Sequence, residues 1–263
     1  MSLRLIVEKI RKIYFYRRSL WSMSSKQFKA KYAGSILGFF WVIINPLFMM
    51  LVITFVFTCV FKTQVKDFSL FVLAGILPWM FFSGALFEAT PSLSAQKSVL
   101  HQFSLPKEIL PLSSVLSYFM NFLISWCITY PIFIFHNPKI ILLAPELMAL
   151  FLLTFIFTCG IALLFSVVNI LFRDLEHLMG ILFMLWFWVT PVFYSIEMVP
   201  VEFRWVFNFN PVTAFILCYR DMIFSAKMPN LLISLEVIGW AFISLFIGLL
   251  VSIRLEASAL KRI

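Results

Sequence analysis

The sequence carries little charge for its length. Asp, Glu, Lys and Arg make up 13% of the 263 residues, while hydrophobic residues make up 62%. A typical soluble domain contains about 25% charged residues, and a soluble core of this size could not bury so much apolar surface. The composition therefore predicts that lipid surrounds most of the chain, and no polar stretch is long enough for a second, soluble domain.

The motifs of several common chemistries are also missing. The chain has no GxxxxGK[ST] loop for nucleotide phosphates, no HExxH zinc motif and no GxSxG nucleophile motif. Its four cysteines have neither CxxC nor histidine-linked spacing, which predicts buried free thiols. We therefore expect no catalytic residue, no metal and no cofactor in this chain.

Long apolar runs dominate what remains, and each has about the 20 residues that a helix needs to cross a bilayer. The six runs cover residues 39–61, 69–87, 109–135, 147–172, 178–196 and 231–253. Only the last contains a charge, Glu236, and a charge at mid-membrane costs about 2.5–3.5 kcal/mol on insertion scales. The sequence predicts an all-α membrane protein with six transmembrane helices.

Basic residues are distributed unevenly between the two sides of this bundle. With the N-terminus inside, fifteen Lys and Arg residues fall on the cytoplasmic side and six fall outside, as the positive-inside rule requires. We expect a multi-pass inner-membrane protein with both termini cytoplasmic, a transmembrane domain at 39–253 and a cytoplasmic tail at 254–263. Topology accounts for the net charge of +9, so we expect no nucleic-acid partner.

Two polar segments flank the spans. Residues 1–38 form an interface segment in which apolar residues from Leu3 to Ile13 recur at helical spacing among basic ones, predicting an amphipathic helix on the cytoplasmic membrane surface. This helix either docks a partner or serves only as an anchor. Residues 197–230 are too polar for a span and too apolar for a free loop, which predicts outer re-entrant or interfacial helices.

Aromatic residues and prolines mark the fifth run. Phe183, Trp186, Phe187, Thr190 and Tyr194 share one helical face, which would meet lipid and neighbouring helices, or sugar rings if it lined a pore. Pro191 in this run, like Pro46 in the first, predicts a kink.

Several short motifs occur in an order and spacing that cover nearly the whole chain. They are Lys31-Tyr32-Ala33-Gly34-Ser35-Ile36-Leu37-Gly38, Trp41, Asn45-Pro46, Pro78-Trp79, Pro106-Lys107-Glu108-Ile109-Leu110-Pro111-Leu112-Ser113, Asn169, Phe172-Arg173-Asp174-Leu175, Thr190-Pro191-Val192-Phe193-Tyr194, Asn210-Pro211 and Arg220-Asp221. This series resembles the permease subunits of ABC exporters for cell-surface polysaccharides, the O-antigen (Wzm-like) and capsule export family.

The resemblance implies a homodimer that works with two separate ATPase subunits, which would hold ATP and Mg. It implies a lipid-linked glycan as cargo, a channel at the dimer interface lined largely by the first and fifth spans, and outer gate helices in 197–226. It also implies that the N-terminal helix and the loop 88–108 contact the ATPase.

The same resemblance assigns roles to individual residues. Coupling to the ATPase is expected at Ser94, Lys97, His101, Pro106, Lys107 and Glu108, and an interface motif at Tyr32, Gly38 and Trp41. Channel lining is expected at Asn45, Phe48, Phe183, Trp186, Phe187, Thr190 and Tyr194. Gate residues are expected at Arg173, Asp174, Asn210, Pro211 and Arg220.

Three alternatives remain open at this point. An exporter of the same architecture could carry a drug or a lipid instead of a glycan. A membrane enzyme acting on lipid-linked sugars would need a tight polar group, for which Asp174, Glu176 and His177 are the candidates. A passive channel would conduct without ATP.

Overall fold

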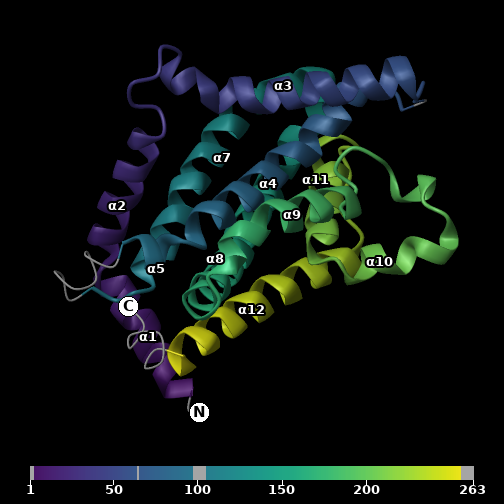
Figure 1. Ribbon diagram of the computed structural model, residues 1–263. Helices are drawn as coiled ribbons and strands as arrows, with labels where there is room; N and C mark the ends of the chain where they lie inside the picture. The colour runs from purple at the N-terminus through teal and green to yellow at the C-terminus, as the bar shows by residue number, and fades with distance from the viewer. Residues whose placement is uncertain (1–2, 64, 97–104, 256–263) are drawn as a thin grey trace.

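The computed structural model describes residues 3–63, 65–96 and 105–255, which form helices and connecting turns without a strand (Figure 1). The predicted all-α class is confirmed for this part of the chain. Its α-helices are α1 (Leu3–Phe15), α2 (Arg17–Ala30), α3 (Trp41–Phe55), α4 (Phe68–Ala89), α5 (Ser92–Ala95), α7 (Ile109–His136), α8 (Ala144–Leu171), α9 (Asp174–Val189), α10 (Arg204–Phe209), α11 (Pro211–Ile223) and α12 (Leu231–Arg254).

Shorter helical turns extend several of these helices. Gly38–Phe40 leads into α3 as a 3-10 turn, and a π-helical turn at Val56–Val60 continues α3. Further 3-10 turns lie at Pro138–Leu143, Ile196–Met198 and Val201–Phe203.

Five helical stretches in the described ranges are long and apolar enough to cross a membrane. They run over Gly38–Val60, Phe68–Ala95, Ile109–His136, Pro138–Leu171 and Leu231–Arg254. These stretches overlap the predicted first, second, third, fourth and sixth spans. The chain is thus a multi-pass membrane protein in which a helix of about 20 residues spans the apolar layer.

The fifth predicted span, 178–196, differs from its prediction. Its helix α9 begins at Asp174 and ends at Val189, because Pro191 follows and Thr190 takes an extended backbone (φ −105°, ψ 130°). Pro191 therefore ends the helix, and the predicted kink within a longer span is wrong. With 16 residues, α9 is about 24 Å long, shorter than a membrane core of about 30 Å.

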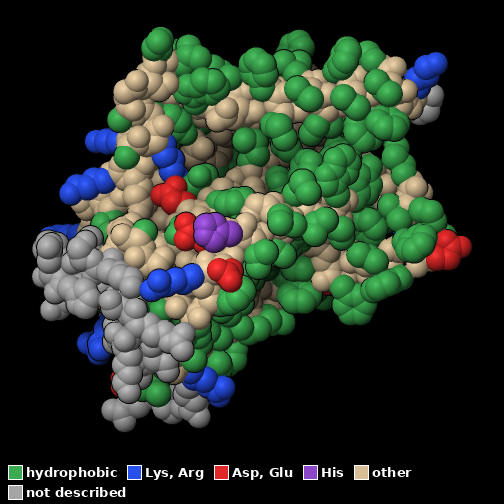
Figure 2. Space-filling view, viewed as in Figure 1, with side chains coloured by type: hydrophobic (Ala, Val, Ile, Leu, Met, Phe, Trp, Pro, Cys, Tyr) green, Lys and Arg blue, Asp and Glu red, His purple; other side chains and the backbone are tan. Residues whose placement is uncertain are grey.

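Helix α4 forms the centre of the bundle. It contacts α3, α7, α8, α9 and α11, and 72% of its most apolar stretch is buried, against 11% for α3. Helices α3 and α9 lie at the periphery and leave much of their apolar surface exposed. Figure 2 shows hydrophobic side chains over most of the visible face, with most charged side chains nearer the side where α1 lies.

Helices α8 and α12 pack closely and run in the same direction. A Cβ atom added to Gly160 would overlap the Ser244 backbone, and one added to Gly248 would overlap the Gly160 carbonyl. Ser244 Oγ also donates to the Phe157 carbonyl at 3.2 Å. Since later residues of α8 pack near later residues of α12, where Ile170 belongs to one cluster with Val251, the two helices are parallel.

Helix α1 contacts the end of α12. We call the part of the bundle where these two helices meet the terminal end. Ile6 and Ile13 of α1 pack partly against the core, whereas Val7 and Ile10 are exposed. The helix has the amphipathic pattern that the sequence indicates.

The cysteines are free, as expected, but only two are buried. Cys159 and Cys218 lie in the core, whereas Cys59 and Cys127 are exposed. The prediction of burial is wrong for the second pair because the outer surface of a membrane bundle is as apolar as its interior.

Candidate functional site

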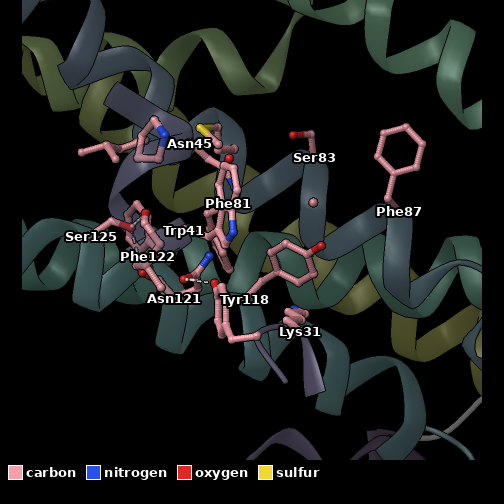
Figure 3. A pocket seen from close by; sticks show the side chains of 16 residues that line it. Lys31, Trp41, Asn45, Phe81, Ser83, Phe87, Tyr118, Asn121, Phe122 and Ser125 are labelled. Atoms are coloured by element: carbon pink, nitrogen blue, oxygen red, sulfur yellow. Dashed lines mark hydrogen bonds between the residues drawn. The ribbon is translucent and has the colours of Figure 1, made fainter. Parts of the chain in front are cut away.

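A pocket of about 470 Å³ opens among the end of α2, the start of α3, and helices α4 and α7 (Figure 3). Trp41 and Asn45 enter it from α3, and Tyr118 and Asn121 enter it from α7. A concave site with a few converging polar groups among aromatic rings is the usual form of a small-molecule site.

A buried cation lies at one edge of this pocket. Lys31 Nζ lies 3.0 Å from Glu88 Oε2 and 3.2 Å from the centre of the Tyr118 ring, so the ammonium is both ion-paired and stacked on an aromatic face. A Cβ atom on Gly84 would overlap the Tyr118 ring, so this glycine lets the ring approach α4. Burial lowers the pKa of Lys31, and the Glu88 carboxylate opposes that shift.

The predicted interface motif forms another wall. The Tyr32 hydroxyl donates to Asn121 Oδ1 at 2.8 Å, and Trp41 Nε1 donates to Ser35 Oγ at 3.0 Å. These bonds tie the turn between α2 and α3 to α7 and to itself. Gly38, with φ +46°, allows the left-handed backbone of that turn.

A second polar cluster lies at the terminal end. Glu108 Oε1 accepts from Ser252 Oγ at 2.6 Å and lies 3.0 Å from Lys9 Nζ, while Lys107 Nζ donates to the Ser252 carbonyl at 3.0 Å. Lys107 and Glu108 are 4% and 1% exposed. These bonds join α1, the start of α7 and the end of α12, so the predicted coupling pair is placed inside the protomer and bound to its neighbours.

The remaining predicted coupling residues are only partly placed. Ser94 is half-buried, donates to the Pro91 carbonyl at 2.8 Å and accepts from Asn169 Nδ2 at 3.3 Å. Pro106 is half-buried. Lys97 and His101 lie outside the described residues.

At the far end of α9, Asn210 fastens the helix to α11. Its Oδ1 accepts from Trp186 Nε1 at 2.9 Å and from the Val212 amide at 3.1 Å. Its Nδ2 donates to Thr190 Oγ1 at 2.9 Å and to the Val189 carbonyl at 3.3 Å. The Asn210 side chain, which is 8% exposed, thus forms hydrogen bonds with groups at the end of α9 and at the start of α11.

Arg220 on α11 holds the turn that follows α9. Its guanidinium donates to the carbonyls of Pro191, Val192 and Tyr194 at 2.7, 3.1 and 3.2 Å, and it stacks 3.6 Å over Phe71. Arg220 is 6% exposed, and three carbonyls surround its charge. The turn at 190–195 is therefore bound to α11 through Arg220, whose side chain also contacts α4.

The structure does not gather all the predicted gate residues. Asn210, half-buried Pro211 and Arg220 lie near the end of α9, whereas Arg173 and Asp174 are exposed at its start. The helix separates the two groups by about 24 Å.

The predicted channel residues also differ in their exposure. Asn45 and Phe48 are exposed on α3. Phe183 and Thr190 are buried inside the protomer, against aromatic rings and Asn210 respectively. Trp186, Phe187 and Tyr194 are half-buried, and the Tyr194 hydroxyl donates to the Trp188 carbonyl at 2.7 Å.

Sequence reasoning missed several residues at these sites. Glu88, Tyr118 and Asn121 lie in or beside predicted spans without a distinctive motif, and Lys9 was one base among nine before the first span. Their roles come from contacts between distant segments, for which the sequence has no local signal. Asp174, Glu176 and His177 are exposed, and no group of three metal-binding side chains occurs in the described ranges.

The bundle, its polar pocket and its parallel helices α8 and α12 define a helical multi-pass membrane protein without a nucleotide-binding loop of its own. The family model described as ABC-2 type transporter matches residues 18–224, and the chain belongs to that family.

Relatives align with most of the chain. An O-antigen export system permease protein RfbA of Klebsiella pneumoniae is 30% identical over 240 residues, which cover 89% of this chain and 90% of the relative. The protein of the same name from Myxococcus xanthus is 29% identical, covering 86% and 87%. The polysialic acid transport protein KpsM of Escherichia coli is 20% identical, covering 85% and 88%.

Proposed function

We propose that this chain is the permease subunit of an ATP-driven exporter that moves a lipid-linked polysaccharide across the bacterial inner membrane. The observation that carries the proposal is the alignment, over nearly the full chain, with proteins named as O-antigen export permeases. Because the sequence has no phosphate-binding loop, two separate ATPase subunits would bind ATP and Mg and supply the energy.

A sixth crossing by the segment that contains α9 is part of this proposal. Helices α8 and α12 are parallel, so the chain must return across the bundle between Leu171 and Leu231. Helix α9 would make most of that return, and the turn held by Arg220 would add length beyond Val189. Six crossings would place both termini in the cytoplasm, which the distribution of basic residues favours.

The segment after α9 would form the outer re-entrant part. Helix α11 is mostly buried against α4, α8 and α12, although it has only 13 residues. Helix α10 and the turns before it carry exposed apolar residues such as Phe203, Trp205 and Phe209, suited to the membrane interface. Irregular backbone at this depth is tolerated when protein covers it.

A second copy of the chain would complete the transport path. Helix α3 exposes Phe48, Leu51, Val52 and Phe55, and α9 exposes Leu185 and Trp188. In a homodimer, the peripheral α3 and α9 of both protomers would enclose a channel, with Asn45 and Phe48 on its wall. Six packed helices of one protomer leave little room for a hydrated glycan.

Coupling would begin at α1. ATP binding by the partner would displace this helix, and the contact between Lys9 and Glu108 would pass the displacement to α7 and α12. The loop at 88–108 and residues Ser94, Lys97 and His101 would complete the docking surface.

Deletion of the gene in its host tests the function. Fractionation and surface labelling should show lipid-linked polysaccharide accumulating inside the cell and lost from its surface, with restoration by the wild-type gene. Unchanged surface glycan would contradict the assignment and favour a lipid or drug as cargo.

A further inference from the structure

The pocket among α2, α3, α4 and α7 contains polar groups that the fold leaves without partners. The Asn45 amide and the Tyr118 hydroxyl have no hydrogen bond to any described residue, although both line the pocket. An amide offers donors and acceptors together, and a phenol offers one of each. Two such groups beside one cavity are suited to a ligand that carries several hydroxyls.

Aromatic rings supply flat surfaces at the same place. Trp41 and Phe87 line the pocket and are 37% and 43% exposed, so ring area remains open to a ligand. The hydrogen bond from Trp41 to Ser35 directs the indole N–H away from ligand binding and fixes the ring. The negative face of an aromatic ring attracts the positively polarised C–H groups on the face of a pyranose.

The charges of the pocket balance each other. Lys31 is paired with Glu88 at 3.0 Å, and the side chains are 19% and 31% exposed. The Lys31 ammonium is covered by the protein, and the adjacent Glu88 carboxylate balances its charge, so the pocket offers little to attract a phosphate or an anionic headgroup. A neutral sugar needs no free charge and could bind the uncharged polar groups of the pocket without disturbing the ion pair.

The size and position of the pocket agree with this chemistry. Its volume of about 470 Å³ lies within the range of about 300–1,000 Å³ that is typical of small-molecule sites, enough for a sugar ring but not for a long glycan. It lies beside the start of α3 and the end of α4, on the side of the bundle from which a glycan made in the cytoplasm would arrive in the proposed orientation.

We propose that this pocket binds a neutral sugar unit of the glycan near the entrance of the transport path, an inference that rests on the proposed function. Trp41 and Phe87 would stack on the ring, while Asn45 and Tyr118 would bind its hydroxyls. The site would select among glycans before the chain enters the channel.

Protection of a cysteine in the pocket tests the binding. Full-length permease in lipid nanodiscs would carry Ser83→Cys, with the exposed Cys59 and Cys127 changed to Ser. Labelling by a soluble maleimide would be followed with methyl glycosides of the sugars in the host's surface polysaccharide, and separately with inorganic phosphate at the same concentration. At least one glycoside should slow labelling several-fold, and phosphate should not.

Two further variants locate the ligand. Asn45→Leu and Tyr118→Phe should each remove most of the protection, whereas Leu152→Ala, on an exposed part of α8, should retain it. Tyr118→Phe deletes a single hydroxyl, so its effect would not arise from misfolding. Protection by phosphate, equal protection in these two variants, or no protection by any glycoside would overturn the proposal.

Complementation separates this inference from the function itself. If the wild-type gene restores surface glycan to the deletion strain and Tyr118→Phe and Asn45→Leu restore it equally well, the sugar pocket is wrong and the exporter assignment stands. If the deletion leaves surface glycan unchanged, the exporter assignment fails.

Discussion

At the scale of single residues, Asn210 has the largest set of contacts at the end of α9. Its amide bonds to Trp186, Val189, Thr190 and Val212 while only 8% exposed. A buried polar group that loses its partner bears its full desolvation cost. The order at the end of α9 therefore depends, beside Arg220, on a side chain that the sequence marks only as part of an Asn-Pro pair.

Replacing Asn210 should destabilise the protein. Asn210→Ala would leave the Trp186 N–H and the Val212 amide without acceptors, at a cost of about 1–3 kcal/mol. Unfolding in mixed micelles with a rising fraction of SDS would measure the loss. Asn208→Ala, two residues away and exposed, is the matched control and should leave stability nearly unchanged.

The buried ion pair at the terminal end gives a second prediction. Removing Glu108 would break the contact of its carboxylate with Lys9 Nζ at 3.0 Å, and breaking a buried pair costs about 3–5 kcal/mol. A double-mutant cycle of Lys9→Met and Glu108→Gln should give a coupling energy of about 0.5–3 kcal/mol in the same unfolding assay. Additive effects would show that the two side chains do not interact.

The sequence identified Lys107 and Glu108 but did not show that they are buried. Their polarity and the neighbouring prolines indicate a loop at a membrane surface, where solvent would be expected. Burial follows from the meeting of three distant helices, since Ser252 and Lys9 supply the partners. Contacts between segments this far apart in the sequence leave no periodic pattern in either segment.

At the scale of helices, apolar periodicity and length predict far more. The third predicted span, 109–135, and the sixth, 231–253, agree with α7 and α12 to within one residue at each end. The fifth span was predicted too long because the apolar run continues past Thr190 to Val192. Only the steric effect of Pro191 ends α9.

The close contact of α8 with α12 yields a prediction about glycine. Gly160→Ala and Gly248→Ala should each destabilise the protein by about 1–3 kcal/mol, because the added methyl groups would overlap backbone atoms of the facing helix. Gly239→Ala, also on α12 but facing open space, is the control. It should be neutral or slightly stabilising, since Ala favours a helix more than Gly does. Equal effects at Gly248 and Gly239 would contradict the packing.

At the scale of the whole molecule, the number of crossings links structure to topology. Five helical stretches in the described ranges are long enough to span, and an odd number would place the termini on opposite sides of the membrane. Yet α1 contacts the end of α12, and Lys9 reaches Glu108 beside Ser252. An even number satisfies this geometry, and the proposed crossing by the segment that contains α9 would supply it.

Labelling of single cysteines would decide this topology. In a chain whose Cys59 and Cys127 are changed to Ser, Glu197→Cys should react with an impermeant maleimide in intact spheroplasts, because it lies beyond the end of α9. His177→Cys, near the start of α9, should react only after the membrane is permeabilised. Both positions are exposed, so access through the protein does not limit the reaction.

Two reference positions calibrate the assay. Lys66→Cys, before α4, should label from outside, and Lys29→Cys, near the end of α2, only after permeabilisation. If His177→Cys and Glu197→Cys labelled from the same side, α9 would lie along the membrane and five crossings would remain. The contact between α1 and α12 would then have to break in the membrane, because an odd number of crossings separates these two ends. Opposite labelling would instead leave that contact intact and make α9, short as it is, the helix that returns the chain between two parallel spans.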